Sequence, residues 1–405
     1  MANLEPSIGI DPSDADRVAT VVARLLPASL VPIFDARFTR SDRLFDEYVS
    51  RLARQVVCDV KLDHALRTWG TTEELVARAR LDPNCAIVPV DWILRRLAER
   101  NVVEVQEGPG GRQFRAAHPI GVLDATEVRE AQQLHDAAAL PSYALAETAA
   151  RAYPAFLEGT SSGEDLLLAP ARLAVWNGYF SNDHSLYAVN NRVGAVALVA
   201  WLAPGPHTIL ELGAGMGSGT VAALDALSRD ARLDDVEAYR ATDIVPTFLR
   251  YAERRVRGQA RTAPTVTFEK LDMNQPFAAQ GVREGTVSVV YAVNTLHVAH
   301  DLAVTLGEIR RTLMPGGQLI ASECVRPLPG KTLYPEFVFN MLATFRAPRL
   351  HPTYRPNGGF LTPEQWRAAL EEAGFVDVRV LPDIARIRDV VPNFALAAIG
   401  GTRAS

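Results

Sequence analysis

A glycine-rich turn between an apolar segment and a helical one constrains this chain more than any other feature. Apolar residues dominate 208–212, and the next segment carries glycines at Gly213, Gly215, Gly217 and Gly219. Glycines at such a place permit a tight turn and let a ligand approach the backbone at the amino end of the following helix. A dinucleotide-binding fingerprint would have glycine at position 218, where this chain has Ser218. The spacing therefore disfavours a dinucleotide site.

Strand-like and helical patterns alternate from about residue 204 to residue 405, which predicts a parallel sheet with helices on both faces. We expect seven strands, at 208–212, 236–242, 265–271, 286–293, 318–323, 376–381 and 394–399. The predicted fold class is therefore α/β, a Rossmann-like and mostly parallel seven-stranded sheet in a domain at 204–405.

An insertion at about 324–361 separates the fifth and sixth expected strands. It contains prolines at positions 327, 329, 335, 348, 352 and 356, which deny it a long helix. We interpret it as a lid or substrate loop. The next helix begins correctly, with Thr362 as its cap and Pro363 at its first position.

The front of the chain, 1–123, is predicted to be mainly helical. Ser41 would cap a helix that runs to about Val57. Thr71 and Glu74 form a capping-box pattern that starts a second helix, and another helix and two short strands follow, at 102–107 and 112–116. Helix, turn, helix and hairpin is the outline of a winged helix. Residues 124–203 are predicted to form a helical connector that covers the active site.

The charge of the winged-helix-like module argues against nucleic-acid binding. Between Thr71 and His118 seven acidic residues (Glu73, Glu74, Asp82, Asp91, Glu99, Glu104, Glu107) balance seven basic ones (Arg78, Arg80, Arg95, Arg96, Arg100, Arg112, Arg115). The whole chain has a net charge of -5 and a pI near 6.0. Phosphate binding needs a positive surface, so we expect a structural or dimerising role instead, with a homodimer as one expected assembly.

Three separated cysteines, Cys58, Cys85 and Cys324, fit neither a disulfide framework nor a paired-cysteine metal site. The first eleven residues do not resemble a signal peptide, and the longest apolar run, 193–204, is too short to span a bilayer. We therefore expect a cytoplasmic protein without a membrane or metal partner.

Two aspartates at strand ends fit a nucleoside ligand. Asp243 follows Gly213 by 243 − 213 = 30 residues, and a carboxylate there can accept hydrogen bonds from a ribose diol. Asp272, at the end of the third strand, can accept one from an adenine amino group. Each aspartate can alternatively belong to an ordinary turn.

These pieces, in this order, resemble class I S-adenosylmethionine-dependent methyltransferases. Segments 239–248, 293–302, 313–319 and 365–375 are similar to the C-methyltransferase domains of polyketide synthases, over roughly 205–385. The resemblance implies S-adenosylmethionine as the cofactor. It implies cofactor contacts from Glu211, Gly213, Ala214, Gly215, Gly217, Asp243, Ile244, Asp272, Met273 and Asn294.

A histidine and a glutamate mark the expected reacting centre. His297 lies just past the fourth strand and Glu323 closes the fifth, so parallel strands bring together residues that are 323 − 297 = 26 positions apart. A carboxylate beside an imidazole fixes its tautomer and stabilises the cation formed on proton abstraction. His297 is therefore the expected general base and Glu323 its orienting partner, as the resemblance also implies. His300 is the competing base, and His297 as a simple strand cap is the plain alternative.

Aromatic and amide residues are frequent between Trp176 and Asn191. By resemblance, Tyr187 and Asn190 would line the reaction chamber, with Tyr179 in reserve; ordinary packing is the alternative.

We predict C-methylation of the α-carbon of a β-ketoacyl chain, free or bound to an acyl carrier protein, in polyketide-type natural-product biosynthesis. Small-molecule O-methyltransferases also combine an N-terminal winged helix with a histidine base, so O-methylation with the same histidine is the first alternative. A non-catalytic regulator that senses S-adenosylmethionine and binds DNA is the second.

Overall fold

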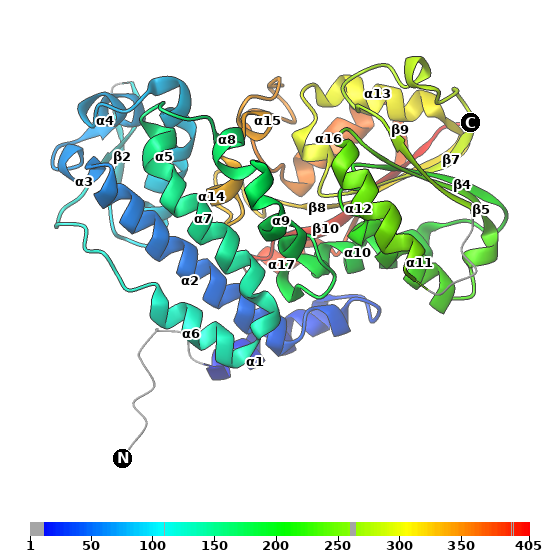
Figure 1. Cartoon of the computed structure of the whole chain (residues 1–405), viewed down its shortest axis with the longest axis horizontal. Helices are drawn as coiled ribbons and strands as arrows, with labels where there is room; N and C mark the ends of the chain where they lie inside the picture. Colours follow the sequence, from blue (N-terminus) through cyan, green and yellow to red (C-terminus); the bar gives the residue numbers. More distant parts are fainter. Residues whose placement is uncertain (1–11, 109, 260–264, 390, 392) are drawn as a thin grey trace. The chain divides into compact units, whose positions relative to one another are not determined.

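The computed structural model describes residues 12–108, 110–259, 265–389, 391 and 393–405 (Figure 1). Its described residues group into two compact units. The helical unit contains Ala36–Tyr179 and Thr332–Arg346 together with the described residues up to Arg17, and the sheet unit contains Val18–Asp35, Phe180–Lys331 and Ala347–Ser405. The boundaries of these units differ from those of the predicted segments 1–123, 124–203 and 204–405. The three-part division stays a prediction.

The sheet unit is built on seven strands. They are β4 (His207–Leu212), β5 (Val236–Asp243), β6 (Thr265–Lys270), β7 (Val287–Val293), β8 (Leu313–Cys324), β9 (Phe375–Leu381) and β10 (Leu396–Arg403). Among the described residues they form one sheet in the order β6-β5-β4-β7-β8-β10-β9 (Figure 1). The pairs from β6 to β8 are parallel, whereas β10 runs antiparallel to both β8 and β9. The predicted α/β class and the mostly parallel seven-stranded sheet are confirmed.

Helices alternate with the strands, as the pattern predicts. Helix α10 (Ser185–Trp201) precedes β4, and the helices that follow strands are α11 (Ser218–Arg229), α12 (Pro246–Arg257), α13 (Leu302–Thr312), α16 (Pro363–Glu372) and α17 (Ile384–Arg388). Every residue of β7 is buried, as expected for a central parallel strand covered on both faces. Thr362 caps α16 by accepting a hydrogen bond from the Gln365 amide, with Pro363 at the first helical position, which confirms the predicted helix start.

Strand β8 begins five residues earlier than the sequence predicts. Leu313 pairs with Val287, but the next pairing joins Gln318 to Val289, so the extra residues form an irregularity in the strand. A Cβ on Gly317 would lie 2.9 Å from the Met314 carbonyl oxygen, and this close approach requires glycine. Gly316 and Gly317, which precede the predicted strand, therefore belong to a bulge within β8.

The helical unit contains α2 (Ala36–Asp59), α3 (Leu62–Ala65), α4 (Thr72–Arg78), α5 (Pro83–Glu99), α6 (Thr126–His135), α7 (Leu140–Leu157), α8 (Gly163–Leu167) and α9 (Leu173–Tyr179). Helix α1 (Pro12–Leu25) continues from this unit into the sheet unit. Helices α2 and α7 lie side by side (Figure 1). The predicted cap at Ser41 is wrong, because α2 begins at Ala36 and Ser41 is buried inside it. The Ser41 hydroxyl instead accepts a hydrogen bond from Gln132, 3.0 Å away.

Helices α4 and α5 precede a hairpin of β2 (Glu104–Gly108) and β3 (Gly111–Arg115), and the short strand β1 (Gly70–Thr71) adds to its β3 edge. This is the predicted winged-helix-like order. The capping box is present, since the Glu74 amide donates to the Thr71 hydroxyl and the Thr71 amide donates to the Glu74 carboxylate. Arg115 pairs with Glu104 at 2.6 Å across the hairpin. The charge of Arg115 is thus paired with a carboxylate of the same hairpin.

The proline-rich insertion is divided between the two units. Its middle part, Thr332–Arg346, forms only two short helices within the described structure, α14 (Glu336–Phe339) and α15 (Ala343–Arg346). This part packs into the helical unit, where Trp92 donates to the Glu336 carboxylate at 2.9 Å and Tyr153 donates to the Phe337 carbonyl at 2.6 Å. The absence of a long helix agrees with the prolines. Its role as a lid stays a prediction.

Across the described ranges, the model contains no helix that is both long and apolar enough to cross a membrane.

Candidate active site

The glycine turn joins β4 to α11 in left-handed backbone conformations. Gly213, Gly215 and Gly217 have φ values of 66°, 54° and 82°. A Cβ on Gly213 would lie 2.3 Å from the Thr295 hydroxyl oxygen, and one on Gly217 would lie 2.7 Å from the Ala252 Cα. Side chains at these positions would be strained and would collide with neighbours. The turn is therefore a close-packed cradle at the amino end of α11, where backbone N–H groups gather.

Asp243 ends β5 next to this turn. Its carboxylate accepts hydrogen bonds from the Gly215 amide at 2.9 Å and from the Val245 amide at 2.8 Å. Burial raises the pKa of Asp243, and the backbone donors act in the opposite direction. The following residue, Ile244, exposes 51% of its surface. An ordered carboxylate and an exposed apolar side chain therefore lie side by side in sequence at the rim of the cradle.

Glu211 lies in β4, two residues before the turn. One of its carboxylate oxygens, Oε2, accepts from the Thr220 hydroxyl at 2.6 Å and from the Tyr239 hydroxyl at 2.9 Å. Burial raises the pKa of Glu211 to about 7, although the two hydroxyl donors act in the opposite direction. The structure thus gives Glu211 protein partners in α11 and β5.

Asp272, Met273 and Asn294 occupy the loops after β6 and β7. The Asp272 carboxylate accepts from the Asn274 amide at 2.9 Å, which is an ordinary turn contact. The Met273 carbonyl accepts from the Thr305 hydroxyl at 3.0 Å. Asn294 adopts a positive φ of 48° and its side-chain oxygen accepts from the Cys324 amide at 2.9 Å. Asn294 therefore ties the end of β7 to the end of β8.

His297 and Glu323 meet at this edge of the sheet. The His297 Nδ1 lies 2.6 Å from the Glu323 Oε2, and the two residues expose 5% and 0% of their surface. The other carboxylate oxygen of Glu323 accepts from the Thr295 amide at 3.1 Å and the Leu296 amide at 2.7 Å. The carboxylate is fixed on both sides, so it holds the imidazole as the tautomer with its proton on Nδ1. Nε2 is then the nitrogen that can accept a proton.

The surroundings of the two histidines differ. The Phe360 ring centroid lies 4.7 Å from that of His297, which gives the imidazole an apolar wall. His300 is exposed and precedes Asp301, the cap of α13. A buried, carboxylate-oriented imidazole suits a general base better than an exposed one.

Two predicted chamber residues lie on α10 in the sheet unit. Tyr187 has the Phe180 ring 5.3 Å away, and burial raises its pKa to about 12. Asn190 exposes 5% of its surface, and its amide nitrogen lies 3.6 Å from the Cys324 sulfur. The Asn190 side-chain oxygen is buried and accepts no hydrogen bond from the described residues. A buried oxygen without a donor is costly, so it marks a place where a ligand or water can bind.

Tyr179 is the last residue of α9 and belongs to the helical unit. Its ring lies 5.9 Å from Trp176 in an edge-on contact. The structure therefore groups Tyr179 with other residues than Tyr187 and Asn190, and its predicted role in the chamber stays a prediction.

Sequence reasoning missed Thr295 and Arg355. Thr295 fills the space that the missing Gly213 side chain leaves. Arg355, which is 1% exposed, donates to the His297 carbonyl oxygen at 2.5 Å. A threonine after an asparagine and an arginine in a proline-rich insertion carry no motif, so no signal in one sequence would have found them.

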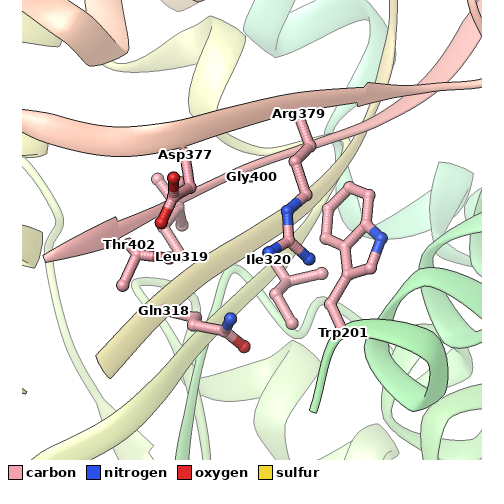
Figure 2. Close-up of a pocket in the computed structure, with 9 residues that line it drawn as sticks. Trp201, Gln318, Leu319, Ile320, Asp377, Arg379, Gly400 and Thr402 are labelled. Carbon is pink, nitrogen blue, oxygen red and sulfur yellow. The ribbon is translucent and has the colours of Figure 1, made fainter. Parts of the chain in front are cut away.

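A small pocket lies elsewhere in the sheet unit (Figure 2). Figure 2 shows the Arg379 guanidinium beside the Trp201 indole, 5.9 Å from the ring centroid. Gly400 makes room for this indole, because a Cβ there would lie 2.7 Å from it. The pocket is lined by Gln318, Leu319 and Ile320 of β8, toward the opposite end of the strand from Glu323. It is separate from the candidate site.

The parts of the chain that the structure describes contain no group of three or more histidine, cysteine, aspartate or glutamate side chains arranged to hold a metal ion.

Comparison with known proteins gives a consistent result. A family model described as a methyltransferase domain matches residues 210–319. The reducing polyketide synthase Preu2 of Preussia isomera is 30% identical over 253 residues, covering 62% of this chain and 10% of Preu2. The methyltransferase calH of Penicillium decumbens is 35% identical over 167 residues, covering 41% of this chain and 43% of calH. The chain therefore spans less than half the length of these relatives.

Solved structures share the fold over nearly the whole chain. The CurJ carbon methyltransferase superimposes with a TM-score of 0.76 at 20% identity, covering 98% of this chain and 100% of that one. The trans-methyltransferase CalH, solved in complex with SAH, gives a TM-score of 0.59 at 21% identity and covers 90% of this chain and 92% of CalH.

The sheet order, the glycine cradle and the matched family model define the class: the chain has a class I methyltransferase fold, and its residues 210–319 match a methyltransferase domain. Within that class it is similar to polyketide synthases in sequence, and its fold is that of the CurJ carbon methyltransferase.

Proposed function

We propose that this chain is a C-methyltransferase of polyketide-type biosynthesis. Its acceptor is the α-carbon of a β-ketoacyl chain carried as a thioester on an acyl carrier protein. The observation that carries the proposal is the buried contact of 2.6 Å between His297 and Glu323 at the carboxyl edge of the sheet. The similarity to polyketide synthases supports the acceptor class.

The residues around the glycine cradle fit S-adenosylmethionine. The turn is open at Gly215, where a Cβ would meet no atom closer than 4.0 Å, and the Asp243 carboxylate stands beside this glycine. Each Asp243 oxygen already accepts one backbone hydrogen bond and retains capacity for another, from a ribose hydroxyl. Bound S-adenosylmethionine supplies an electrophilic methyl group. The proposed contacts are Glu211, Gly213, Ala214, Gly215, Gly217, Asp243, Ile244, Asp272, Met273 and Asn294.

His297 and Glu323 provide the chemistry that a carbon acceptor requires. An α-carbon between a ketone and a thioester loses its proton to a positioned base and becomes an enolate, which is the nucleophile. In this proposal His297 accepts the proton at Nε2, and the Glu323 carboxylate stabilises the imidazolium through Nδ1. Because both side chains are buried, this stabilisation acts with little screening by water.

Tyr187 and Asn190 are the proposed positioning groups for the acceptor. The Asn190 oxygen is unsatisfied, and the amide nitrogen of the same side chain lies 3.6 Å from the sulfur of Cys324, the residue that follows Glu323. A substrate donor that binds this oxygen would remove the penalty of leaving it buried without a partner.

O-methylation is the second candidate, favoured by the winged-helix-like order of α4, α5 and the hairpin.

One experiment separates the two candidates. The protein is offered a carrier-bound β-ketoacyl chain and a free phenol separately, each with methyl-labelled S-adenosylmethionine. The proposal expects label on the α-carbon of the carrier-bound chain, and His297→Ala should abolish it while cofactor binding persists. Label on the phenol alone would overturn C-methylation, and near wild-type turnover of His297→Ala would overturn the mechanism.

A further inference from the structure

Arg355 donates hydrogen bonds to the short segment that contains His297. Its two terminal nitrogens donate to main-chain carbonyls, one to Ala299 at 2.7 Å and the other to His297 at 2.5 Å. One planar guanidinium thus holds two carbonyl groups of a single turn, that of the middle residue of the 3₁₀ helix Leu296–Val298 and that of the residue after this helix. A fork of this geometry fixes orientation better than a single-point donor.

The chain around Arg355 is itself secured to the same loop. His351 and Arg355 exchange backbone hydrogen bonds of 2.9 Å in each direction. The Tyr354 ring stacks on His351 with centroids 3.8 Å apart and an angle of 11°. The Arg349 amide donates to the His300 carbonyl at 2.6 Å. The main chain around Arg355 is therefore itself held in place by hydrogen bonds and a ring contact.

The charge of Arg355 is buried with carbonyl partners. The residue is 1% exposed, and its Nε has no hydrogen-bond partner among the described residues. Burial lowers the pKa of Arg355 to about 10, while Asp301, Glu323 and Tyr354 act in the opposite direction. The guanidinium is still protonated at neutral pH. Burying a charge without a close carboxylate is unfavourable for stability, so its presence points to a use.

We propose that Arg355 is a positioning residue for proton transfer, which fixes the main chain at His297 and so keeps the imidazole oriented toward the acceptor proton. This inference rests on the proposed function, because it assigns His297 the role of base. Arg355 touches neither the imidazole nitrogens nor, in this account, the substrate.

The test compares Arg355→Met, which removes both donors, with Arg355→Lys, which keeps the charge but offers a single-point donor. NMR of the full chain with labelled histidine follows the signal of the His297 ring at one pH, and steady-state kinetics separates kcat from KM. In Arg355→Met the ring signal should move and broaden, and kcat should fall roughly a hundredfold with KM near wild type, because the segment is no longer held. In Arg355→Lys the ring signal should stay closer to wild type and kcat should fall roughly tenfold, because the segment is held less firmly.

Arg367→Met is the matched control, since it removes an exposed arginine of α16 in the same unit. It should leave both the His297 ring signal and kcat near wild type. An unchanged ring signal with wild-type kcat in Arg355→Met would overturn the positioning role. If that variant does not fold, wild-type kcat in Arg355→Lys would overturn it.

The NMR measurement needs no acceptor, so the two hypotheses fail separately. A changed His297 ring signal in Arg355→Met with no methyl transfer by the wild type to any carrier-bound chain would overturn the proposed function alone. Methyl transfer by the wild type with wild-type kcat in Arg355→Met would overturn this inference alone.

Discussion

Acidic side chains have different kinds of partner in the two units of this molecule. In the helical unit, Asp46 and Glu47 of α2 face arginines: Arg100 contacts Asp46 at 2.6 Å, Arg51 contacts Glu47 at 2.9 Å, and Arg96 also pairs with Asp46. Burial opposes the ionisation of Asp46, but the charges of Arg96 and Arg100 outweigh it and lower its pKa. These acids hold helices together as ion pairs.

In the sheet unit, the acids at the carboxyl ends of the strands accept hydrogen bonds from hydroxyls, backbone amides and an imidazole. Glu211 accepts from Thr220 and Tyr239, Asp243 from two amides, and Glu323 from two amides with His297 beside it. Burial raises the pKa of Glu211 and Asp243. Acids whose charge is held by neutral donors are poised for a ligand or a proton, which is typical of a functional site.

Asp42 departs from this division. It lies in α2, yet burial and the charge of Asp46 raise its pKa to about 7, and its carboxylate accepts from the Tyr334 hydroxyl at 2.9 Å. The raised pKa of Asp42 in the helical unit shows that a raised pKa alone does not define a site. The sheet unit differs because Glu211, Asp243 and Glu323, which accept hydrogen bonds from neutral donors, lie at the carboxyl ends of neighbouring strands.

The largest effect is expected for Glu323→Gln. The amide keeps the shape of the side chain but cannot stabilise an imidazolium, so kcat should fall by roughly 10³-fold. Cofactor affinity, measured by calorimetry, should stay near wild type. Glu269→Gln, which removes a carboxylate paired with Arg240 on the same sheet, is the control and should retain activity. Equal losses of kcat in Glu323→Gln and Glu269→Gln would contradict the special role of the acids at the carboxyl ends of the strands.

Glu211→Gln should change how stability depends on pH. The folded-state pKa of Glu211 is about 7 against a reference of 4.5. An acid with a raised folded pKa contributes fully below its unfolded pKa, and that contribution is lost as pH rises through the folded pKa. Between about pH 5 and about pH 8 the wild type should therefore lose about 2–3 kcal/mol of unfolding free energy relative to Glu211→Gln. Urea denaturation at several pH values measures this difference, and the exposed Glu237→Gln on β5 should show none.

Asp46→Asn should show the opposite pH dependence. At neutral pH it should lower the unfolding free energy by about 2 kcal/mol, because buried Arg96 loses a charged partner. The folded-state pKa of Asp46 is lowered, so this contribution is present above the unfolded pKa and is lost as pH falls through the folded value. The exposed Asp59→Asn at the end of α2 is the control. A loss that grows toward acidic pH would contradict the ion-pair account.

The smallest effects are expected at the capping boxes, one in each unit. Thr71→Ala at α4 and Thr362→Ala at α16 should each lower the unfolding free energy by about 1 kcal/mol, because a helix amide loses its acceptor. Serine at either position should restore most of the loss. The two units are expected to respond alike here, so a large difference in denaturation between the two variants would show that the units differ in more than their acids.

The alternating patterns predicted the sheet well because strand ends and helix starts are local properties. Thr362 with Pro363 and Thr71 with Glu74 could be recognised from a few neighbouring residues. Ser41 could not, because a distant contact with Gln132 decides that its hydroxyl points inward. The early start of β8 depends on pairing between Leu313 and Val287, which no local pattern records.

The meeting of His297 with Glu323 was predictable because parallel neighbouring strands align their carboxyl ends. Their catalytic roles stay predictions. The buried position of Arg355 could not be predicted, because a proline-rich insertion has no periodicity that would show which side chain turns inward. Tyr179 shows the same limit: it lies eight residues before Tyr187 in the sequence but in a different unit.

Proton exchange at the acceptor carbon tests the central claim most directly. A carrier-bound β-ketoacyl chain is incubated in D₂O with the protein and S-adenosylhomocysteine, so that a proton can leave but no methyl group can arrive. Deuterium should enter the α-carbon faster than in the absence of protein, and His297→Ala should return the rate to that background. Exchange by His297→Ala at the wild-type rate would contradict the assignment of this imidazole as the base.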